Sequence, residues 1–254
     1  MNIVMRSRVL SVCLGMILEA AEIQAGVSCS WTTKVSTGYL AKVGVNLYDS
    51  PTVFNDFGCS SGTFGGGIWT STGVDGDEYG STFAEEWDVY AFWTHQYKHV
   101  RVKLIAAYYA LNDLEHFQDD VWVLDGEIEF PTVPVLQPYL AIRQFGEIGS
   151  ESPKSGRFLW LGATRSQPLG FTLGIATAKL SIDVHGAYSD GALGQDSGLV
   201  FWRGTIGLPI PLTKQLIVIP SVLYQLPASG QKERRRPYTT EDEFVASMTF
   251  SYLF

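Results

Sequence analysis

The last eleven residues of the chain, 244–254, alternate between apolar side chains and mostly small ones. Every second residue is apolar, at Phe244, Ala246, Met248, Phe250, Tyr252 and Phe254. Because successive side chains of a β-strand point to opposite faces, this pattern predicts a strand with one apolar face and one mildly polar face. Transmembrane β-barrels cross a bilayer with strands of about ten such residues. An edge strand of a soluble β-sandwich has the same pattern, so the rest of the chain has to separate the two.

The composition favours the membrane alternative. Charged residues make up only 17% of the chain, whereas soluble domains carry about a quarter. Beyond the first thirty positions no run of about 18 uncharged apolar residues occurs, so we expect no transmembrane helix in the mature chain. The net charge of −8 argues against nucleic acid as a partner, since phosphate neutralisation needs a basic surface.

Strand-like runs separated by turn-rich breaks fill the chain from residue 36 onward. The expected strands are 36–48, 52–57, 63–74, 85–95, 99–110, 120–130, 135–146, 156–165, 178–188, 199–208, 216–226 and 244–254.

The breaks between these runs are alternately short and long. Segments 96–98 and 131–134 are tight, whereas 75–84 and 227–243 are long. Segment 166–177 fits this rhythm only if the two strands beside it extend toward a turn at 167–170. Bacterial barrels have short periplasmic turns and long extracellular loops. The sequence therefore predicts an all-β fold, a transmembrane antiparallel up-and-down β-barrel of about 12 strands with its C-terminus in the periplasm.

Charged residues gather on one face of the predicted strands, and the opposite face is apolar. A charge that faces lipid costs roughly 2–4 kcal/mol at the bilayer midplane, so we assign the charged face to the lumen. The expected pore-lining residues are Asp88, Arg101, Lys103, Asp125, Glu127, Glu129, Arg143, Asp183 and Arg203. Tryptophans 69, 93, 160 and 202 are candidates for the aromatic girdles at the two membrane surfaces.

The N-terminus has the features of a secretory signal peptide. Arg6 and Arg8 precede an apolar run at 9–18, which is too short to span a membrane, and Ala25 is a candidate cleavage position. We therefore expect a signal peptide at 1–25 and an outer-membrane barrel domain at 26–254. Of the three cysteines, Cys13 falls in this leader, and Cys29 and Cys59 either pair in the oxidising periplasm or remain as buried thiols.

The end of the chain resembles the C-terminal assembly signal of bacterial outer-membrane proteins. That signal is a final Phe with an aromatic residue two positions earlier, here Phe254 and Tyr252, with Phe250 before them. The resemblance implies insertion by the barrel-assembly machinery into a membrane of lipid and lipopolysaccharide. The basic run 232–236 is either a solvated loop or a contact for lipopolysaccharide phosphates.

Short motifs over residues 35–110 resemble a family of uncharacterised proteobacterial outer-membrane proteins, the Gcw-type conserved hypotheticals. These motifs are a tyrosine at 39, Asp-Ser-Pro at 49–51, Gly-Ile-Trp-Thr-Ser at 67–71, Glu-Trp-Asp-Val-Tyr at 86–90 and Tyr-Tyr at 108–109. The chain departs from the family after Tyr39, where Ala41-Lys42-Val43-Gly44 replaces the usual basic residue and glycine. The resemblance implies a barrel and no particular activity.

No motif for catalysis, metal binding or a cofactor stands out. The histidines show no metal-ligand spacing, and no nucleophile elbow or P-loop occurs. We therefore predict no enzyme activity, no metal and no cofactor, and a narrow porin-like channel for passive passage of small solutes. One alternative is a structural barrel with an occluded lumen. Another is a membrane-embedded lipid hydrolase, for which His95 is the only histidine expected on the outer face.

Overall fold

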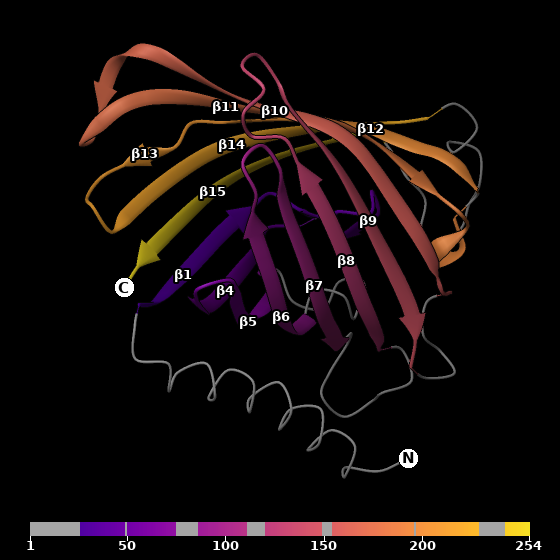
Figure 1. The fold of residues 1–254 in the computed structure, drawn as a ribbon. Coiled ribbons are helices and arrows are strands. Elements are labelled where there is room, and N and C mark those ends of the chain that lie inside the picture. Colours follow the sequence, from indigo (N-terminus) through magenta and orange to yellow (C-terminus); the bar gives the residue numbers. More distant parts are fainter. Residues whose placement is uncertain are drawn as a thin grey trace.

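The computed structural model describes residues 26–48, 50–74, 86–110, 120–148, 154–195, 197–228 and 242–254, which form a closed antiparallel β-barrel (Figure 1). The strands follow one another around the ring in chain order, and pairing of β12 with β14 and of β15 with β1 closes it. The wall strands are β1 Val27–Ser36, β4 Thr52–Ser61, β5 Phe64–Gly73, β6 Glu86–Gln96, β7 Arg101–Ala110, β8 Val121–Glu129, β9 Gln137–Glu147, β10 Gly156–Leu173, β11 Ala176–Ser189, β12 Gly198–Gly207, β14 Leu216–Pro227 and β15 Glu243–Leu253. The predicted all-β barrel of about 12 strands is confirmed.

Four short elements complete the described structure. Tyr39–Leu40 (β2) and Asn46–Tyr48 (β3) form a small hairpin of their own, Ile210–Pro211 (β13) pairs with β14, and Ala192–Gly194 (η2) is a single 3-10 turn. Among the described residues, no helix has the length and apolar character needed to cross a bilayer.

The C-terminal strand β15 closes the barrel, as its alternation predicts. It pairs with β14 on one side, where Tyr252 lies opposite Leu216. On its other side Tyr252 lies opposite Trp31 of β1. Figure 1 shows the end of β15 beside the beginning of β1. The expected first strand, 36–48, would have paired with β15 near Tyr39, and this prediction is wrong, because the first wall strand lies earlier in the chain.

The expected first strand, 36–48, is the main error of the sequence analysis. The wall strand is Val27–Ser36, and the residues after it turn away from the wall. Two features favour this departure. Gly44 has a φ of 88°, a conformation that suits glycine rather than a strand residue, and Ala41 and Val45 are joined across the turn by a 2.9 Å backbone hydrogen bond.

The connections differ between the two rims of the barrel. One rim, here called the short-turn rim, holds the C-terminus and tight turns such as 62–63 and 174–175. The opposite long-loop rim holds the longer connections, including residues 37–51 between β1 and β4. The two strands beside 166–177 do extend into it, but the turn expected at 167–170 is wrong. β10 runs through those residues and meets β11 at a turn at Gly174, whose φ is 64°.

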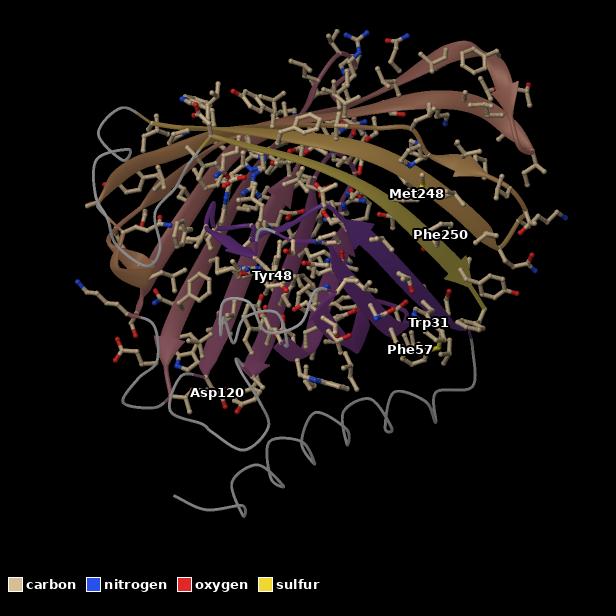
Figure 2. The ribbon with its side chains drawn as sticks, turned by 180° about the vertical axis from the view of Figure 1, so that it is seen from behind. Trp31, Tyr48, Phe57, Asp120, Met248 and Phe250 are labelled. Atoms are coloured by element: carbon tan, nitrogen blue, oxygen red, sulfur yellow. A yellow bond between two sulfur atoms is a disulfide. The ribbon has the colours of Figure 1, made fainter. Side chains whose placement is uncertain are left out.

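The outer face of the barrel is apolar. Figure 2 labels Met248 and Phe250 on β15, Trp31 on β1 and Phe57 on β4, and all four side chains are exposed. Leu124, which lies between two inward positions of β8, is 51% exposed. The predicted outward positions of β15 are exposed in the same way at Phe244, Tyr252 and Phe254. Such exposure of large apolar side chains around a closed wall is typical of a lipid-facing surface.

Candidate functional site

The β2–β3 hairpin, residues 37–50, crosses the lumen below the long-loop rim. It leaves the wall after Ser36 and returns to it at Thr52, two residues that lie opposite each other on β1 and β4. Its turn reaches strands far around the ring: the guanidinium of Arg203 on β12 donates a 2.8 Å hydrogen bond to the Ala41 carbonyl. The Gln225 amide on β14 donates a 2.9 Å bond to the Gly44 carbonyl. The hairpin is therefore attached to the wall at Ser36 and Thr52, and its turn is bonded to β12 and β14 on the other side of the lumen.

The turn of the hairpin fits closely against the ring of Phe201. A Cβ atom added at Gly44 would lie 2.3 Å from two ring carbons of Phe201, so this backbone has no room for a side chain. Val43 and Val45 beside it are buried in an apolar cluster with the inward side chains of β8 to β12. The wall members of this cluster include Val121, Val123, Phe145, Phe158, Trp160, Val200 and Phe201. The hairpin and this cluster fill the lumen near the long-loop rim.

A cavity of about 550 Å³ remains inside the barrel, between the hairpin and the inner faces of β1 and β4 to β9. Its charged lining side chains are Lys34, Lys42, Asp56, Glu86, Asp88, Lys103, Asp125 and Arg143. Its aromatic lining side chains are Tyr39, Phe54, Trp69, Tyr90, Tyr109 and Phe145. Such a mixture of apolar walls and a few converging polar groups is usual for small-molecule sites.

The short motifs of the first half of the chain meet at this cavity. Tyr39 of the hairpin donates a 2.5 Å hydrogen bond to the Glu86 carboxylate. Trp69 lies 6.0 Å from Tyr39, centroid to centroid, and directly opposite Asp88 in the strand register. A Cβ at Gly67 would collide with the Phe57 carbonyl and the Tyr90 hydroxyl, at 2.3 and 2.6 Å. These motif residues thus build one site.

Arg143 and Asp125, both predicted to face the lumen, form a buried pair across β9 and β8. The guanidinium donates two hydrogen bonds, of 2.7 and 2.6 Å, to the two carboxylate oxygens. The side chains are only 13% and 10% exposed. Arg143 also lies 5.7 Å from the ring of Tyr109. Two-point pairing of this kind fixes both charged groups in one geometry.

The other predicted pore-lining residues lie at several heights along the barrel. Asp88 and Lys103 line the cavity. Arg101 and Glu129 form an ion pair near the short-turn rim, where the arginine is half exposed. Glu127 lies opposite Lys103 in the register of β8 and β7. The Asp183 Oδ1 atom lies within hydrogen-bond distance of His185 Nδ1, at 2.7 Å, and Arg203 holds the hairpin. The nine residues therefore do not form one ring of charge.

Sequence reasoning missed several lumen residues, among them Lys34, Lys42, Tyr39, Asp56 and Glu86. Lys34 lies on the unpredicted strand β1, with its ammonium 5.0 Å from the centre of the Phe54 ring. Lys42 and Tyr39 belong to the hairpin, which lies within the predicted wall strand 36–48. Tyr39 is the first of the motifs that resemble the Gcw-type family, so its place in that series was the sequence signal that could have indicated the site. Trp69 and Trp160, expected in the girdles, both face the lumen.

The structure places His95 on the outer face near the short-turn rim. Its ring stacks 5.8 Å from Trp93 and meets Tyr97 edge-on at 4.5 Å. Within the described ranges, the ring contacts of His95 are with these two aromatic side chains and not with a serine. Over those same ranges no cluster of three His, Cys, Asp or Glu side chains is arranged to hold a metal ion. The basic run 232–236 and the leader lie outside the described residues.

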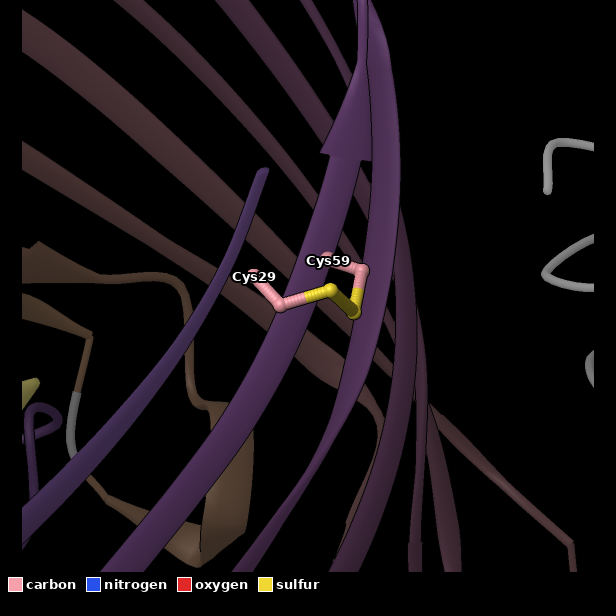
Figure 3. Close-up of a disulfide and its surroundings, with 2 residues drawn as sticks. All are labelled: Cys29 and Cys59. Carbon is pink, nitrogen blue, oxygen red and sulfur yellow. A yellow bond between two sulfur atoms is a disulfide. The ribbon is translucent and has the colours of Figure 1, made fainter. Parts of the chain in front are cut away.

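A disulfide joins Cys29 of β1 to Cys59 of β4 (Figure 3). The two residues lie directly opposite each other in the strand register. The backbone N–H of the last residue, Phe254, donates a 2.9 Å hydrogen bond to the Cys29 carbonyl. The disulfide therefore lies beside the β15–β1 seam at the short-turn rim.

Comparison with known proteins identifies the fold of the chain. No family model matches the sequence, and no curated protein does. The solved structure of the KdgM porin is similar over 89% of this chain and 99% of its own, with 9% identity and a TM-score of 0.53. The NanC porin is similar over 88% of this chain and 98% of its own, with 6% identity and a TM-score of 0.52. The chain thus has the fold of porin-like outer-membrane β-barrels.

Proposed function

We propose that this chain is an outer-membrane channel for passive passage of small solutes, narrowed by the β2–β3 hairpin. The observation that carries the proposal is the cavity of about 550 Å³ inside a closed barrel, which is lined by both positively and negatively charged side chains. An apolar outer face and a charged inner face are the requirements of a barrel that conducts across lipid.

The structural neighbours support this role. Both are named porins, and a second KdgM structure is described as the porin in complex with disordered oligogalacturonate. We propose a non-enzymatic role on the same ground. No solute is carried over from those proteins, because the identity is 9% or less.

The remaining expectations belong to the same proposal. Residues 1–25 act as a signal peptide that is removed after Ala25, and the aromatic end at Phe250, Tyr252 and Phe254 directs insertion by the barrel-assembly machinery. The short-turn rim then faces the periplasm and the long-loop rim faces lipopolysaccharide. Membership of the Gcw-type family stays a prediction from the motifs.

A barrel with an occluded lumen is the second candidate. The apolar cluster around Val43, Trp160 and Phe201 favours it, because that cluster fills the lumen under the long-loop rim. The two candidates differ in whether solutes pass beside the hairpin, and not in the fold.

Reconstitution separates the two candidates. Refolded protein is added to a planar lipid bilayer and, in parallel, to liposomes tested for swelling in small sugars and amino acids. A channel gives small, resolvable current steps and swelling that falls with solute size. Correctly folded protein that shows neither current nor swelling establishes the occluded barrel and overturns the channel. The variant Asp190→Asn, at the long-loop rim, serves as a folding-matched control that keeps the wild-type current.

A further inference from the structure

Lys34 and Glu86 lie on two sides of the lumen cavity with aromatic rings between them, among further charged side chains of both signs that line the same cavity. Four residues on neighbouring strands are paired in turn. Lys34 of β1 lies opposite Phe54 of β4, Phe54 lies opposite Ser71 of β5, and Ser71 lies opposite Glu86 of β6. They form a single row across four neighbouring strands. Strands are about 4.8 Å apart, so the backbones at the two ends of the row are roughly 14 Å apart around the wall. Side chains that extend into the cavity narrow this gap to the length of a small molecule.

The acidic wall is a pair of buried carboxyl groups. Asp88 is 7% exposed and lines the cavity. Its side chain is hydrogen-bonded to that of Glu86, and Glu86 also accepts the Tyr39 hydroxyl. Two carboxyl groups side by side in a buried site favour a ligand that brings a positive charge and N–H donors.

The basic wall has an ammonium group without a carboxylate. Within the part of the chain that the structure describes, the ion pairs involve Arg101, Arg143, Arg157 and His185, and not Lys34. The Lys34 ammonium lies over the Phe54 ring instead, at 5.0 Å. This contact leaves the ammonium able to bind an anionic group that enters the cavity.

The space between the two walls is aromatic. The Phe54 and Trp69 ring centres are 5.6 Å apart, and Tyr39 meets Phe54 edge-on at 5.0 Å. All three rings line the cavity. A flat or apolar segment of a solute packs well against such faces.

We infer that this cavity binds a small zwitterionic solute: a cationic amine at one end, an anionic group at the other and a flat apolar middle. The amine donates to Asp88, the anion meets Lys34, and the middle packs on Trp69 and Phe54. The inference rests on the proposed channel function, because it names the class of solute that the channel selects.

Three matched probes test this assignment by calorimetric titration of the refolded barrel. 4-(Aminomethyl)benzoate carries both charges on a ring, 4-methylbenzoate lacks the amine, and benzylamine lacks the carboxylate. The first should bind, and each of the other two should bind about tenfold or more weakly, because each leaves one charged group of the site without its hydrogen bond.

Variants of the two walls give the second arm. Asp88→Asn and Lys34→Met should each weaken binding of 4-(aminomethyl)benzoate about tenfold or more, whereas Asp190→Asn should leave it unchanged. Folding of each variant is checked by its heat-sensitive migration in detergent gels. Should Asp88→Asn not fold, Lys34→Met and the three probes on the wild-type protein still decide the question.

Titration does not depend on current, so the two proposals fail separately. A conducting barrel that does not bind 4-(aminomethyl)benzoate overturns the zwitterion site and leaves the channel standing. Equal affinity for 4-methylbenzoate also overturns it, since the site is then a simple anion site. Binding by a barrel that passes no current supports the site and overturns the channel.

Discussion

Arg203 donates a 2.8 Å hydrogen bond to the backbone carbonyl of Ala41, and so ties β12 to the turn of a hairpin that starts between β1 and β4. The same guanidinium donates bonds of 3.2 and 2.6 Å to the side-chain oxygen of Gln225. Arg203 is 5% exposed. It thus fixes an element that crosses the lumen.

Replacement of Arg203 by methionine should loosen the hairpin. The change removes charge-assisted hydrogen bonds, each worth about 1.5–3 kcal/mol, and leaves the Ala41 carbonyl without this donor. We expect a less stable barrel with larger and noisier current steps. Planar-bilayer recording beside Asp190→Asn, which breaks an exposed ion pair at the long-loop rim and leaves the hairpin contacts in place, isolates the effect. Identical currents in Arg203→Met and wild type contradict the restraint.

Gly44→Ala should unseat the hairpin turn. Both Gly44 and Gly62 have positive φ, of 88° and 59°, so alanine at either position meets a backbone penalty of about 1–2 kcal/mol. Only Gly44 also meets the Phe201 ring, whereas no atom lies within 4 Å of the position at Gly62. Overpacking adds about 1–3 kcal/mol. Denaturant titrations that give equal losses for the two variants argue against the close fit.

Strands with a regular alternation of side chains could be predicted from the sequence, and strands with a weak alternation could not. The strand Val121–Glu129 has apolar residues on one face and Asp125, Glu127 and Glu129 on the other, and such alternation predicts both the strand and its orientation. The strand Val27–Ser36 has Ser, Thr and Lys inward, and its outward face is interrupted by the polar Thr33, so its pattern is weak. The closing strand at 244–254 could be identified because both of its faces are regular.

The hairpin could not be predicted because an alternating pattern does not tell whether the apolar face of a segment packs against lipid or against the inside of the barrel. Val43 and Val45 alternate as lipid-facing residues do, yet they pack on Phe201 and Trp160 inside the barrel. That contact joins residues more than a hundred positions apart in the sequence, and no local pattern records it. The candidate site was missed for the same reason, since about a third of its lining comes from β1 and the hairpin.

Loss of the Arg143–Asp125 pair should destabilise the barrel strongly. Removal of one partner of a buried ion pair leaves the other charge uncompensated, at a cost of about 3–5 kcal/mol. Arg143→Met should therefore lower the free energy of unfolding by that amount. Asp190→Asn breaks the exposed Arg157–Asp190 pair and should change it by less than about 1 kcal/mol. A loss from Arg143→Met as small as that of the control contradicts this assignment.

The Asp190 carboxylate should show a pH dependence confined to acid conditions. The Arg157 backbone N–H, then its guanidinium, hold the pKa of Asp190 below its ordinary value of 3.8. A depressed pKa means that the stabilisation is present above the ordinary value and is lost as the pH falls through the folded-state value. The unfolding midpoints of wild type and Asp190→Asn should differ slightly at pH 7 and converge only as the pH falls below 3.8 and through the lower folded-state pKa. A constant difference across that range contradicts the linkage.

Reduction of the Cys29–Cys59 disulfide should weaken the barrel beside its seam. The two cysteines are 30 positions apart, and a cross-link of that span stabilises by about 3–4 kcal/mol in the chain-entropy treatment. Dithiothreitol should lower the temperature at which the wild-type barrel unfolds in detergent gels. The double variant Cys29→Ser/Cys59→Ser should already unfold at that lower temperature and should not respond to the reductant. Equal responses of both proteins contradict a role for the disulfide.

The central claim is that the β2–β3 hairpin narrows an otherwise open barrel. It is tested most directly by single-channel conductance of the wild type and of a variant in which residues 39–48 are replaced by a short Gly-Ser linker. Both wall strands beside the hairpin keep their residues, and Ser36 and Thr52 already lie opposite each other. The account predicts small steps for the wild type and severalfold larger steps for the variant. Equal conductance, or silence from both folded proteins, contradicts it.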